Sequence, residues 1–395
     1  MIVNRRSCLA LALTIASFVL GLDRSPVRAD VASDQPGAIL VFPKILVDTS
    51  IVPLTTRGRV DTLIRISNVS SRPATVHCFW VNANGHCHNS PGTVCNPRKF
   101  AVSTAQCPNN GLCIADWQET DFRLNITPRQ PIAWLASRGS VLCRPGDPVE
   151  PPCLPLGQFH PGPGGQDNEG SNILPVSEDP FIGHLKCIQV DANGAPIDRS
   201  DLRGEAEIIT SDLAGGLDVS AYSAIGIPAL PGRNNQDDTL VLGGPAAEYS
   251  SCPNILIMDH FFDGATDPIS SRTVTTALTL VPCSENYAQQ EPIITPVQFL
   301  VFNEFEQRFS TSRVVQCFDD ITISNIETRS NDRSLFSAAV AGTLTGQTRI
   351  RGVGNAGHTL LGVAEEFRAG GGTAAFNLHF HGTRPESDLI SLPPN

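Results

Sequence analysis

The chain has 395 residues, with 28 basic and 39 acidic side chains and a net charge of −11 at pH 7. A protein that binds nucleic acid needs a basic surface to displace phosphate counterions, and this chain has the opposite sign. The negative charge also disfavours binding to anionic membrane surfaces. We therefore expect no nucleic-acid partner. The length predicts two or three domains of roughly 150 residues each.

The first 29 residues have the pattern of a signal peptide. Arg5 and Arg6 precede an apolar run over residues 8–22, and Val27-Arg28-Ala29 has the small-x-small pattern at which signal peptidase cleaves. A membrane anchor is the alternative, but the run is shorter than the roughly 20 residues that span a bilayer. We expect a mature chain without a transmembrane segment, either secreted or held in the periplasm or at the outer surface of a bacterium. The paired arginines leave general and twin-arginine export both open.

The rest of the chain is built from short segments rich in Val, Ile, Thr and Phe, bounded by Gly, Pro, Asn and Asp, and helical periodicity is nearly absent. This pattern is typical of β-strands. The N-terminal half predicts strands at 38–47, 62–67, 75–82, 122–126, 132–136, 181–190 and 204–210. The C-terminal half predicts strands at 254–262, 272–281, 297–302, 313–318, 321–326, 337–344, 348–353 and 374–380. The similar segments Ile39-Leu40-Val41-Phe42 and Phe299-Leu300-Val301-Phe302 suggest a duplicated sandwich.

These strands predict an all-β fold with two β-sandwich domains, because about seven strands fit one sandwich. The first domain is expected at 30–227. It carries two cysteine-rich loop insertions, 86–116 and 138–178, which are too long to be bare connections in a compact domain. The stretch 228–251 is dense in Gly, Asn and Asp and predicts a linker. Residues 252–395 are expected to form a second β-rich domain.

The cysteines predict disulfides. Twelve are present, and loss of Cys8 with the signal peptide leaves eleven, with no Cys-x-x-Cys pair that would favour zinc. Because eleven is odd, at least one is a thiol, is joined to another chain or binds something else. The sequence leaves the connectivity open. Its candidates are Cys107 with Cys113 and Cys143 with Cys153 inside the insertions, Cys78 with Cys187 between two strands, and the further cysteines Cys252 and Cys283.

Part of the N-terminal half is similar to a known type of module. Residues 61–68 form an alternating strand that leads through an Asn-x-Ser turn to 74–76, and a later run, 122–131, is followed by 181–185. This order of strands and turns resembles the immunoglobulin-like modules of bacterial envelope proteins. The resemblance covers residues 38–210 and implies an immunoglobulin-like sandwich that serves adhesion, scaffolding or spacing, without a reaction. The two cysteine-rich insertions depart from it.

Two histidines are the candidate metal ligands. His379 and His381 are separated by one residue, and alternate residues of a strand point the same way, so both can reach one transition-metal ion. The alternative is two histidines on a half-exposed strand. His86 and His88 have the same spacing, but Cys87 between them is expected to be in a disulfide. Calcium is a further candidate because the chain is acidic, although the EF-hand pattern of acidic residues is missing.

The segment around Asp259, His260 and Asp263 is the candidate hydrolase site. A hydrolase needs an acid and a base that meet at one point. In a strand, Asp259 and Phe261 share one face while His260 lies on the other, so we expect these groups to diverge. The sequence therefore predicts an exported, non-catalytic binding or structural protein, with an envelope protein or a glycan as partner. The alternative is a secreted metal-dependent enzyme or a hydrolase.

Overall fold

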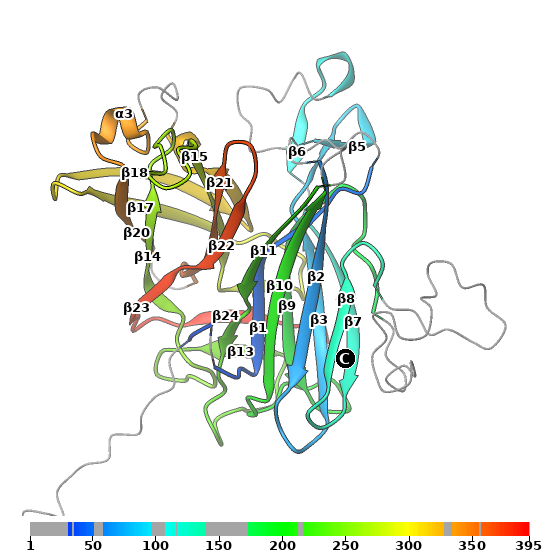
Figure 1. The fold of residues 1–395 in the computed structure, drawn as a ribbon. Coiled ribbons are helices and arrows are strands. Elements are labelled where there is room, and N and C mark those ends of the chain that lie inside the picture. The colour runs from blue at the N-terminus through cyan, green and yellow to red at the C-terminus, as the bar shows by residue number, and fades with distance from the viewer. Residues whose placement is uncertain are drawn as a thin grey trace, which may run out of the picture.

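The computed structural model describes residues 31–33, 35–50, 58–95, 107–115, 117–139, 173–211, 216–327, 334–354 and 357–394. The predicted all-β fold is confirmed (Figure 1). The one α-helix of the described residues is α3 (Ala338–Ala341), and none of the helices among them has the length and apolar character needed to cross a membrane. The expected signal peptide, residues 1–29, lies outside the described residues.

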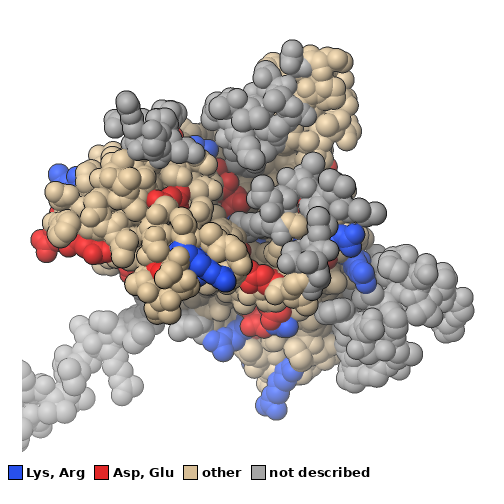
Figure 2. Space-filling view, turned by 45° about the horizontal axis from the view of Figure 1, so that its top comes forward, with Lys and Arg blue, Asp and Glu red and all other residues tan. Residues whose placement is uncertain are grey.

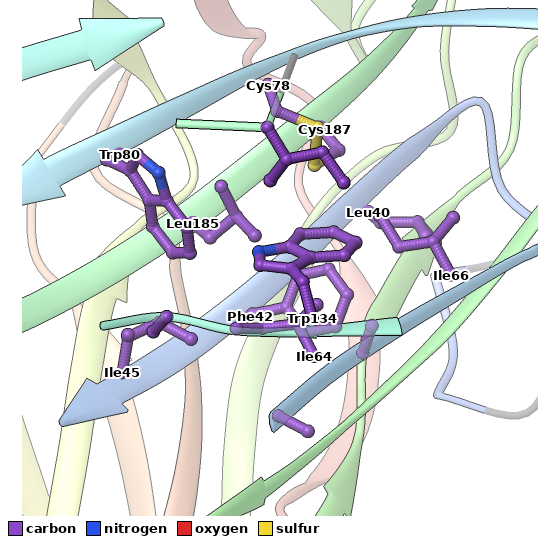
Figure 3. Packing of buried hydrophobic residues seen from close by; sticks show 14 of the residues in the cluster. Leu40, Phe42, Ile45, Ile64, Ile66, Cys78, Trp80, Trp134, Leu185 and Cys187 are labelled. Atoms are coloured by element: carbon purple, nitrogen blue, oxygen red, sulfur yellow. A yellow bond between two sulfur atoms is a disulfide. The ribbon is translucent and has the colours of Figure 1, made fainter. Parts of the chain in front are cut away.

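The N-terminal sandwich consists of a five-stranded and a four-stranded antiparallel sheet. The five-stranded sheet, N5, has the order β12 (Ile225–Ile227), β1 (Ile39–Val47), β9 (Phe181–Val190), β3 (Ala74–Asn82) and β7 (Gln118–Ile126). The four-stranded sheet, N4, has the order β11 (Leu217–Ser223), β10 (Leu202–Ser211), β2 (Arg59–Asn68) and β8 (Pro131–Leu135). Alternate side chains of the two sheets form a core that contains Trp80, Trp134 and the Cys78–Cys187 disulfide (Figure 3).

The C-terminal sandwich also pairs a five-stranded with a four-stranded antiparallel sheet. The five-stranded sheet, C5, has the order β18 (Arg308–Gln316), β17 (Ile294–Asn303), β20 (Thr345–Gly352), β14 (Pro253–Phe261) and β23 (His379–Thr383). The four-stranded sheet, C4, has the order β19 (Asp319–Thr322), β15 (Val274–Pro282), β21 (Leu360–Arg368) and β22 (Thr373–Asn377). Met258, Phe299 and Phe336 lie in the core between them.

Two small sheets complete the described structure. One contains β13 (Thr239–Leu242), β24 (Asp388–Ser391) and β16 (Glu285–Asn286), and the other contains β5 (Ser90–Cys95), β4 (Gly85–Cys87) and β6 (Cys113–Ala115). Short 3₁₀ turns are η1 (Pro108–Asn110) and η3 (Ile323–Asn325). The second small sheet forms the described part of the first cysteine-rich insertion.

The two sandwiches have the same topology. In chain order, β1, β2, β3, β7, β8, β9, β10, β11 and β12 correspond one by one to β14, β15, β17, β18, β19, β20, β21, β22 and β23. With this correspondence the strand order of N5 is identical to that of C5, and the order of N4 is identical to that of C4. The topology agrees with a duplicated sandwich.

Hydrogen bonds between the first two strands of each sandwich also correspond. The Thr62 hydroxyl in β2 donates to the carbonyl oxygen of Leu46 in β1 at 2.9 Å. The Thr276 hydroxyl in β15 donates to the carbonyl oxygen of Phe261 in β14 at 3.0 Å. Both threonines are buried. In each sandwich the same residue type thus joins the two sheets at the same place.

The end of the third strand is built in the same way in both sandwiches. Asn82 ends β3 and faces Gly183, and Asn303 ends β17 and faces Gly346. Each asparagine side chain accepts the backbone N–H two residues later at 3.0 Å, which forms an Asx turn. A Cβ at either glycine would lie within 2.8 Å of a carbonyl oxygen of the third strand, so only glycine fits there.

The second face of N5 packs against C4 and the small sheet of β13, β24 and β16, so the two sandwiches lie side by side (Figure 1). The shared cluster contains Phe79 and Tyr287, whose rings stack with centroids 4.2 Å apart. Its other buried members include Ile39, Val41, Val81 and Ile188 from N5, Val281 and Leu361 from C4, and Phe318. Burial of this much apolar surface favours one rigid body over two loosely linked domains.

Lys44 in β1 forms a buried ion cluster at this interface. Its ammonium group lies 2.8 Å from Asp320 in β19 and 3.0 Å from Glu365 in β21. The hydroxyls of Thr279 and Ser220 donate to the same two carboxylates, at 2.6 and 2.8 Å. Because a buried charge is tolerated only when it is paired and hydrogen-bonded, this cluster fixes how β1 lies on C4.

Lys186 in β9 is the second fully buried lysine. Its ammonium group donates to the carbonyl oxygens of Pro282 and Cys283, at 2.9 and 3.1 Å, and lies 3.6 Å from Glu285. Burial lowers the pKa of Lys186, and the neighbouring Glu285 opposes this shift. Lys44, Lys99 and Lys186 are the three lysines of the chain. Two of the three therefore hold the sandwiches together.

The segment 228–251, expected to be a linker, is part of the folded body. It contains β13, which pairs with β24 near the C-terminus. Leu240, Leu242 and Tyr249 have no exposed surface and belong to the cluster between the sandwiches. The Gly, Asn and Asp residues form the turns of this segment, and its apolar residues are buried. Turn-forming composition was therefore mistaken for a linker.

The disulfides agree with the sequence in part. Cys78 pairs with Cys187, as predicted, and Cys252 pairs with Cys283. The expected local pair of Cys107 and Cys113 is wrong, because Cys107 pairs with Cys87 and Cys113 with Cys95. Strands β4, β5 and β6 bring distant cysteines closer than sequence spacing suggests. Cys143 and Cys153 lie outside the described residues, and Cys317 is a buried thiol.

Substitution of Lys44 by methionine should destabilise the protein by about 3–5 kcal/mol at neutral pH, because Asp320 and Glu365 would lose their buried counter-charge. Urea unfolding of the mature chain measures this loss. Arg351→Met is the matched control, because Arg351 is exposed and its loss should change stability by no more than about 0.5 kcal/mol. Equal stabilities of the two variants would contradict a structural role for the ion cluster.

Candidate functional site

The structure places His379 and His381 on the edge strand β23 of sheet C5. Both side chains are exposed, on the face of C5 that points away from the core. They lie opposite Ile257 and Ile255 of β14. Among the described residues, the groups of three side chains close enough to share a metal ion contain cysteines of the Cys87–Cys107, Cys95–Cys113 and Cys252–Cys283 disulfides, and neither histidine belongs to one.

Asp259 and His260 point to opposite sides of β14. Asp259 is exposed, and its carboxylate accepts the Gln347 side-chain amide at 3.0 Å. His260 is buried against the rings of Phe262 and Phe336. The two groups that a hydrolase would need to bring together therefore face away from each other, as the strand alternation predicted.

His260 is neutral and fully engaged. Its Nδ1 lies 3.0 Å from the Phe261 carbonyl oxygen, which can only accept, so Nδ1 carries the proton. Its Nε2 then accepts the Thr348 hydroxyl at 2.8 Å. Burial lowers the pKa of His260 to about 4. This histidine joins β14 to β20 and has no lone pair or proton left for a substrate.

An open pocket of about 510 Å³ lies beside these residues, at the ends of β14, β17 and β20. Three carboxylates line it: Asp259, Glu304 and Glu366. The Glu304 carboxylate accepts both the hydroxyl and the backbone N–H of Thr345, which holds the pKa of Glu304 below its usual range. Glu366 accepts the backbone N–H of Phe261 at 3.2 Å. A general acid needs a raised pKa, whereas the pKa of Glu304 is lowered. The hydrogen bonds to Thr345 therefore suit Glu304 to a structural role at the start of β20.

The outer face of C5 has an apolar centre and a basic edge. Half-buried apolar side chains occupy its middle, namely Ile255, Ile257, Leu300 and Phe302. Arg349 lies among them on the central strand β20, and further basic and amide side chains surround them, namely Arg308, Arg351, His379, His381, Gln298 and Gln347. Cross-strand pairs place Leu300 beside Arg349, and Arg349 beside Ile257. The Arg349 guanidinium lies 5.5 Å from the centre of the Phe302 ring, within the range of a cation–π contact.

This basic face belongs to a protein with a net charge of −11. Figure 2 shows another view, in which Asp, Glu, Lys and Arg side chains form small separate groups between large uncharged areas. The arginines of C5 were not predicted as functional residues. The signal that could have identified them is the alternation in 347–352, Gln-Thr-Arg-Ile-Arg-Gly, in which buried Thr348 and Ile350 place Arg349 and Arg351 on one face.

The corresponding face of N5 is the one that packs on C4. Cys78 and Cys187 face each other in N5 as Phe299 and Ile350 do in C5, and this match sets the correspondence of all neighbouring positions. The apolar centre of C5 then corresponds to residues of the sandwich interface, namely Ile39, Val41, Phe79 and Val81. Arg349 corresponds to Lys186, the buried lysine of that interface.

The edge of the C5 face differs from its counterpart in N5. Ile225 and Ile227 lie opposite Val41 and Ile39 in β1, and His379 and His381 occupy the corresponding positions opposite β14. Ile188 corresponds to Arg351. C5 thus keeps the apolar centre and one cation of a docking face, and replaces the apolar edge with side chains that tolerate water.

The buried His260 should make stability depend on pH. The unfolded chain binds this proton near pH 6.5 and the folded chain only near pH 4, so the fold should lose roughly 3 kcal/mol as the pH falls through that window. A His260→Gln variant should lack this part of the slope, whereas His379→Gln, at an exposed histidine, should retain it. Urea unfolding at several pH values measures the slopes. The same slope in all three proteins would contradict a buried neutral His260.

No known family model matches this sequence, and a search of the curated proteins gives no significant match.

Proposed function

We propose that the chain is an exported, non-catalytic binding and structural protein of a bacterial envelope, and that it binds through the outer face of C5. The disulfides support folding in an oxidising compartment, since such bonds persist outside the cytoplasm. The N-terminal signal-peptide pattern supports export, and the resemblance to immunoglobulin-like envelope modules supports a non-catalytic role in the envelope. Secretion, rather than retention in the envelope, is the alternative location.

One observation carries the proposal: the face of C5 that corresponds to the covered face of N5 has no sheet of the described residues packed on it. In N5 this face is buried by C4 together with the small sheet of β13, β24 and β16. In C5 the same positions keep four apolar side chains, and Leu300 and Phe302 among them are half-buried without a covering sheet. An apolar centre surrounded by polar side chains, with Arg enriched, is the usual anatomy of a protein–protein interface.

The charges of the C5 face favour an acidic protein as partner. Arg308, Arg349 and Arg351 lie on it beside two histidines, with Asp259 as the acidic residue at one end. Complementary charges speed encounter and select partners, whereas the apolar centre supplies most of the affinity. A glycan would use mainly polar and flat aromatic contacts, and Phe302 is the only Phe, Tyr or Trp among the residues of this face named above. The face therefore fits an acidic protein better than a glycan.

The divergence of Asp259 and His260 supports binding over hydrolysis. A nucleophile or acid must share one point in space with its base, and these side chains leave β14 in opposite directions. The pocket nearby holds carboxylates that accept hydrogen bonds from the protein itself. These contacts use the groups as structural anchors.

Immobilised mature protein should retain acidic envelope proteins, and Arg349→Glu should reduce this retention at least tenfold because it reverses the central cation. Arg233→Glu is the matched control, since it makes the same change of charge at an exposed turn outside the face. Quantitative binding of the retained, purified partner measures the loss. Equal affinities of both variants would exclude the C5 face.

Elemental analysis of the same mature protein separates binding from the alternative of a metal enzyme. A stoichiometric copper or zinc content that disappears in His381→Ala, together with hydrolytic or oxidative turnover, would contradict the proposed function.

A further inference from the structure

We propose that a pocket on the outer face of N4 is a second binding site, and that its ligand is a neutral saccharide. The pocket has a volume of about 410 Å³, within the range of roughly 300 to 1,000 Å³ that small-ligand sites occupy. It lies on the N-terminal sandwich and shares no residue with the C5 face. This site therefore extends the proposed function and does not depend on it.

The pocket lies at one end of N4, where the four strands of the sheet each contribute a side chain. Ser67 of β2 lies opposite Arg203 of β10 and Pro131 of β8. Glu205 of β10 lies opposite Ser223 of β11. All five residues line the pocket. Because alternate side chains of a strand point the same way, these side chains share the face of N4 that points away from the core.

The strand registers align this face of N4 with the face of C4 that receives N5. Thr62 faces Ile208 in N4, as Thr276 faces Glu366 in C4. Each residue of β2 therefore has a counterpart in β15, and each residue of β10 has one in β21. The pocket can thus be compared position by position with a surface that binds a sheet.

The residues of C4 at the pocket positions are apolar and covered. Val281 and Leu361 belong to the cluster between the sandwiches, and Val363 is buried beside them. Their counterparts in N4 are polar, and Ser67 is half-buried whereas the other two are exposed: Ser67 corresponds to Val281, Arg203 to Leu361 and Glu205 to Val363. N4 is therefore polar where C4 receives a sheet, which favours a small polar ligand over a second protein sheet.

The side chains of the pocket combine hydrogen-bond donors and acceptors. The guanidinium groups of Arg65 and Arg203 only donate, and the Glu205 carboxylate only accepts. The hydroxyls of Ser67 and Ser223 can do both. Each hydroxyl of a sugar also donates and accepts, so a saccharide can use all of these groups. An apolar ligand would bury them without partners, which costs free energy.

The charges of the pocket favour a neutral ligand over an anion. The Arg65 guanidinium donates to Glu205 at 2.7 Å and also to Glu207, so two carboxylates fix its position. Together with Arg203, these residues make two positive and two negative charges. A phosphate or carboxylate would therefore gain little attraction. The fixed guanidinium–carboxylate group instead presents donors and acceptors in a set geometry to an uncharged ligand.

The segment before β1 supplies one wall of the pocket. Ser33 and Gln35 of this segment line it. Backbone hydrogen bonds tie Ala32 to β12 and Gly37 to β10, on either side of these two residues. The wall is therefore formed before a ligand binds, which lowers the entropic cost of binding.

The test titrates the mature protein with neutral oligomers of glucose, mannose, galactose and N-acetylglucosamine, followed by saturation-transfer difference NMR. At least one oligomer should bind at millimolar concentration or below. Ser67→Phe should abolish this binding because the ring fills the pocket, and Glu205→Gln should weaken it about tenfold because a charged acceptor is lost. Ser211→Phe is the matched control, since Ser211 is half-buried on β10 outside the pocket. Circular dichroism verifies the fold of each variant.

Failure of all four oligomers to bind would overturn the inference, as would equal affinities of Ser67→Phe and Ser211→Phe. Inorganic phosphate that binds the wild type more tightly than any oligomer, and no longer binds Ser67→Phe, would show an anion site and contradict a neutral ligand. Arg349→Glu should bind the saccharide as the wild type does. A protein that retains acidic envelope proteins and binds no saccharide would overturn this site and leave the proposed function standing.

Discussion

Sheet N5 is covered on both faces, by N4 on one side and by C4 with the small sheet of β13, β24 and β16 on the other, and the rest of the molecule is arranged around this contact. Its central strands show the consequence in their composition, because β1 is buried at every residue and β3 and β9 at almost every residue. Strand β17 of C5, which corresponds to β3, alternates between buried residues and exposed or half-buried ones. Strands covered on both faces are apolar throughout, whereas strands with one solvent-exposed face alternate between apolar and polar residues. The two patterns come from one topology in two environments.

Lys44 and Lys186 give this contact its specificity. Apolar surface alone allows sheets to slide, but a buried ammonium group has to meet its carboxylates and carbonyls at fixed positions. The acidic partners lie on C4 and on the segment after β15. In a chain with a net charge of −11, the few lysines are thus used at the junction of the two sandwiches. On the outer face of C5, Arg349 occupies the position of Lys186 and lies over the Phe302 ring.

The sequence predicted the features that depend on local pattern. Alternating and apolar segments predicted the all-β fold, and two cysteines in long strands predicted the Cys78–Cys187 bond. Features that depend on tertiary pairing were missed. Because β4, β5 and β6 form one sheet, Cys107 pairs with Cys87 and Cys113 with Cys95, and not with each other. The segment expected to be a linker is buried, because its strand β13 pairs with β24. The alternation in 347–352 indicates that Arg349 and Arg351 share one face of a strand. Only the topology shows that this face of C5 corresponds to the covered second face of N5.

The central claim is that N5 and C4 join the sandwiches into one cooperative unit. The three tryptophans, Trp80, Trp117 and Trp134, all belong to the N-terminal half, so fluorescence reports that half, whereas far-UV circular dichroism reports both. Urea unfolding of the oxidised mature protein, followed by both probes, tests the claim directly. We predict coincident transitions with one midpoint. A circular dichroism transition that splits, with fluorescence following only one part, would contradict it.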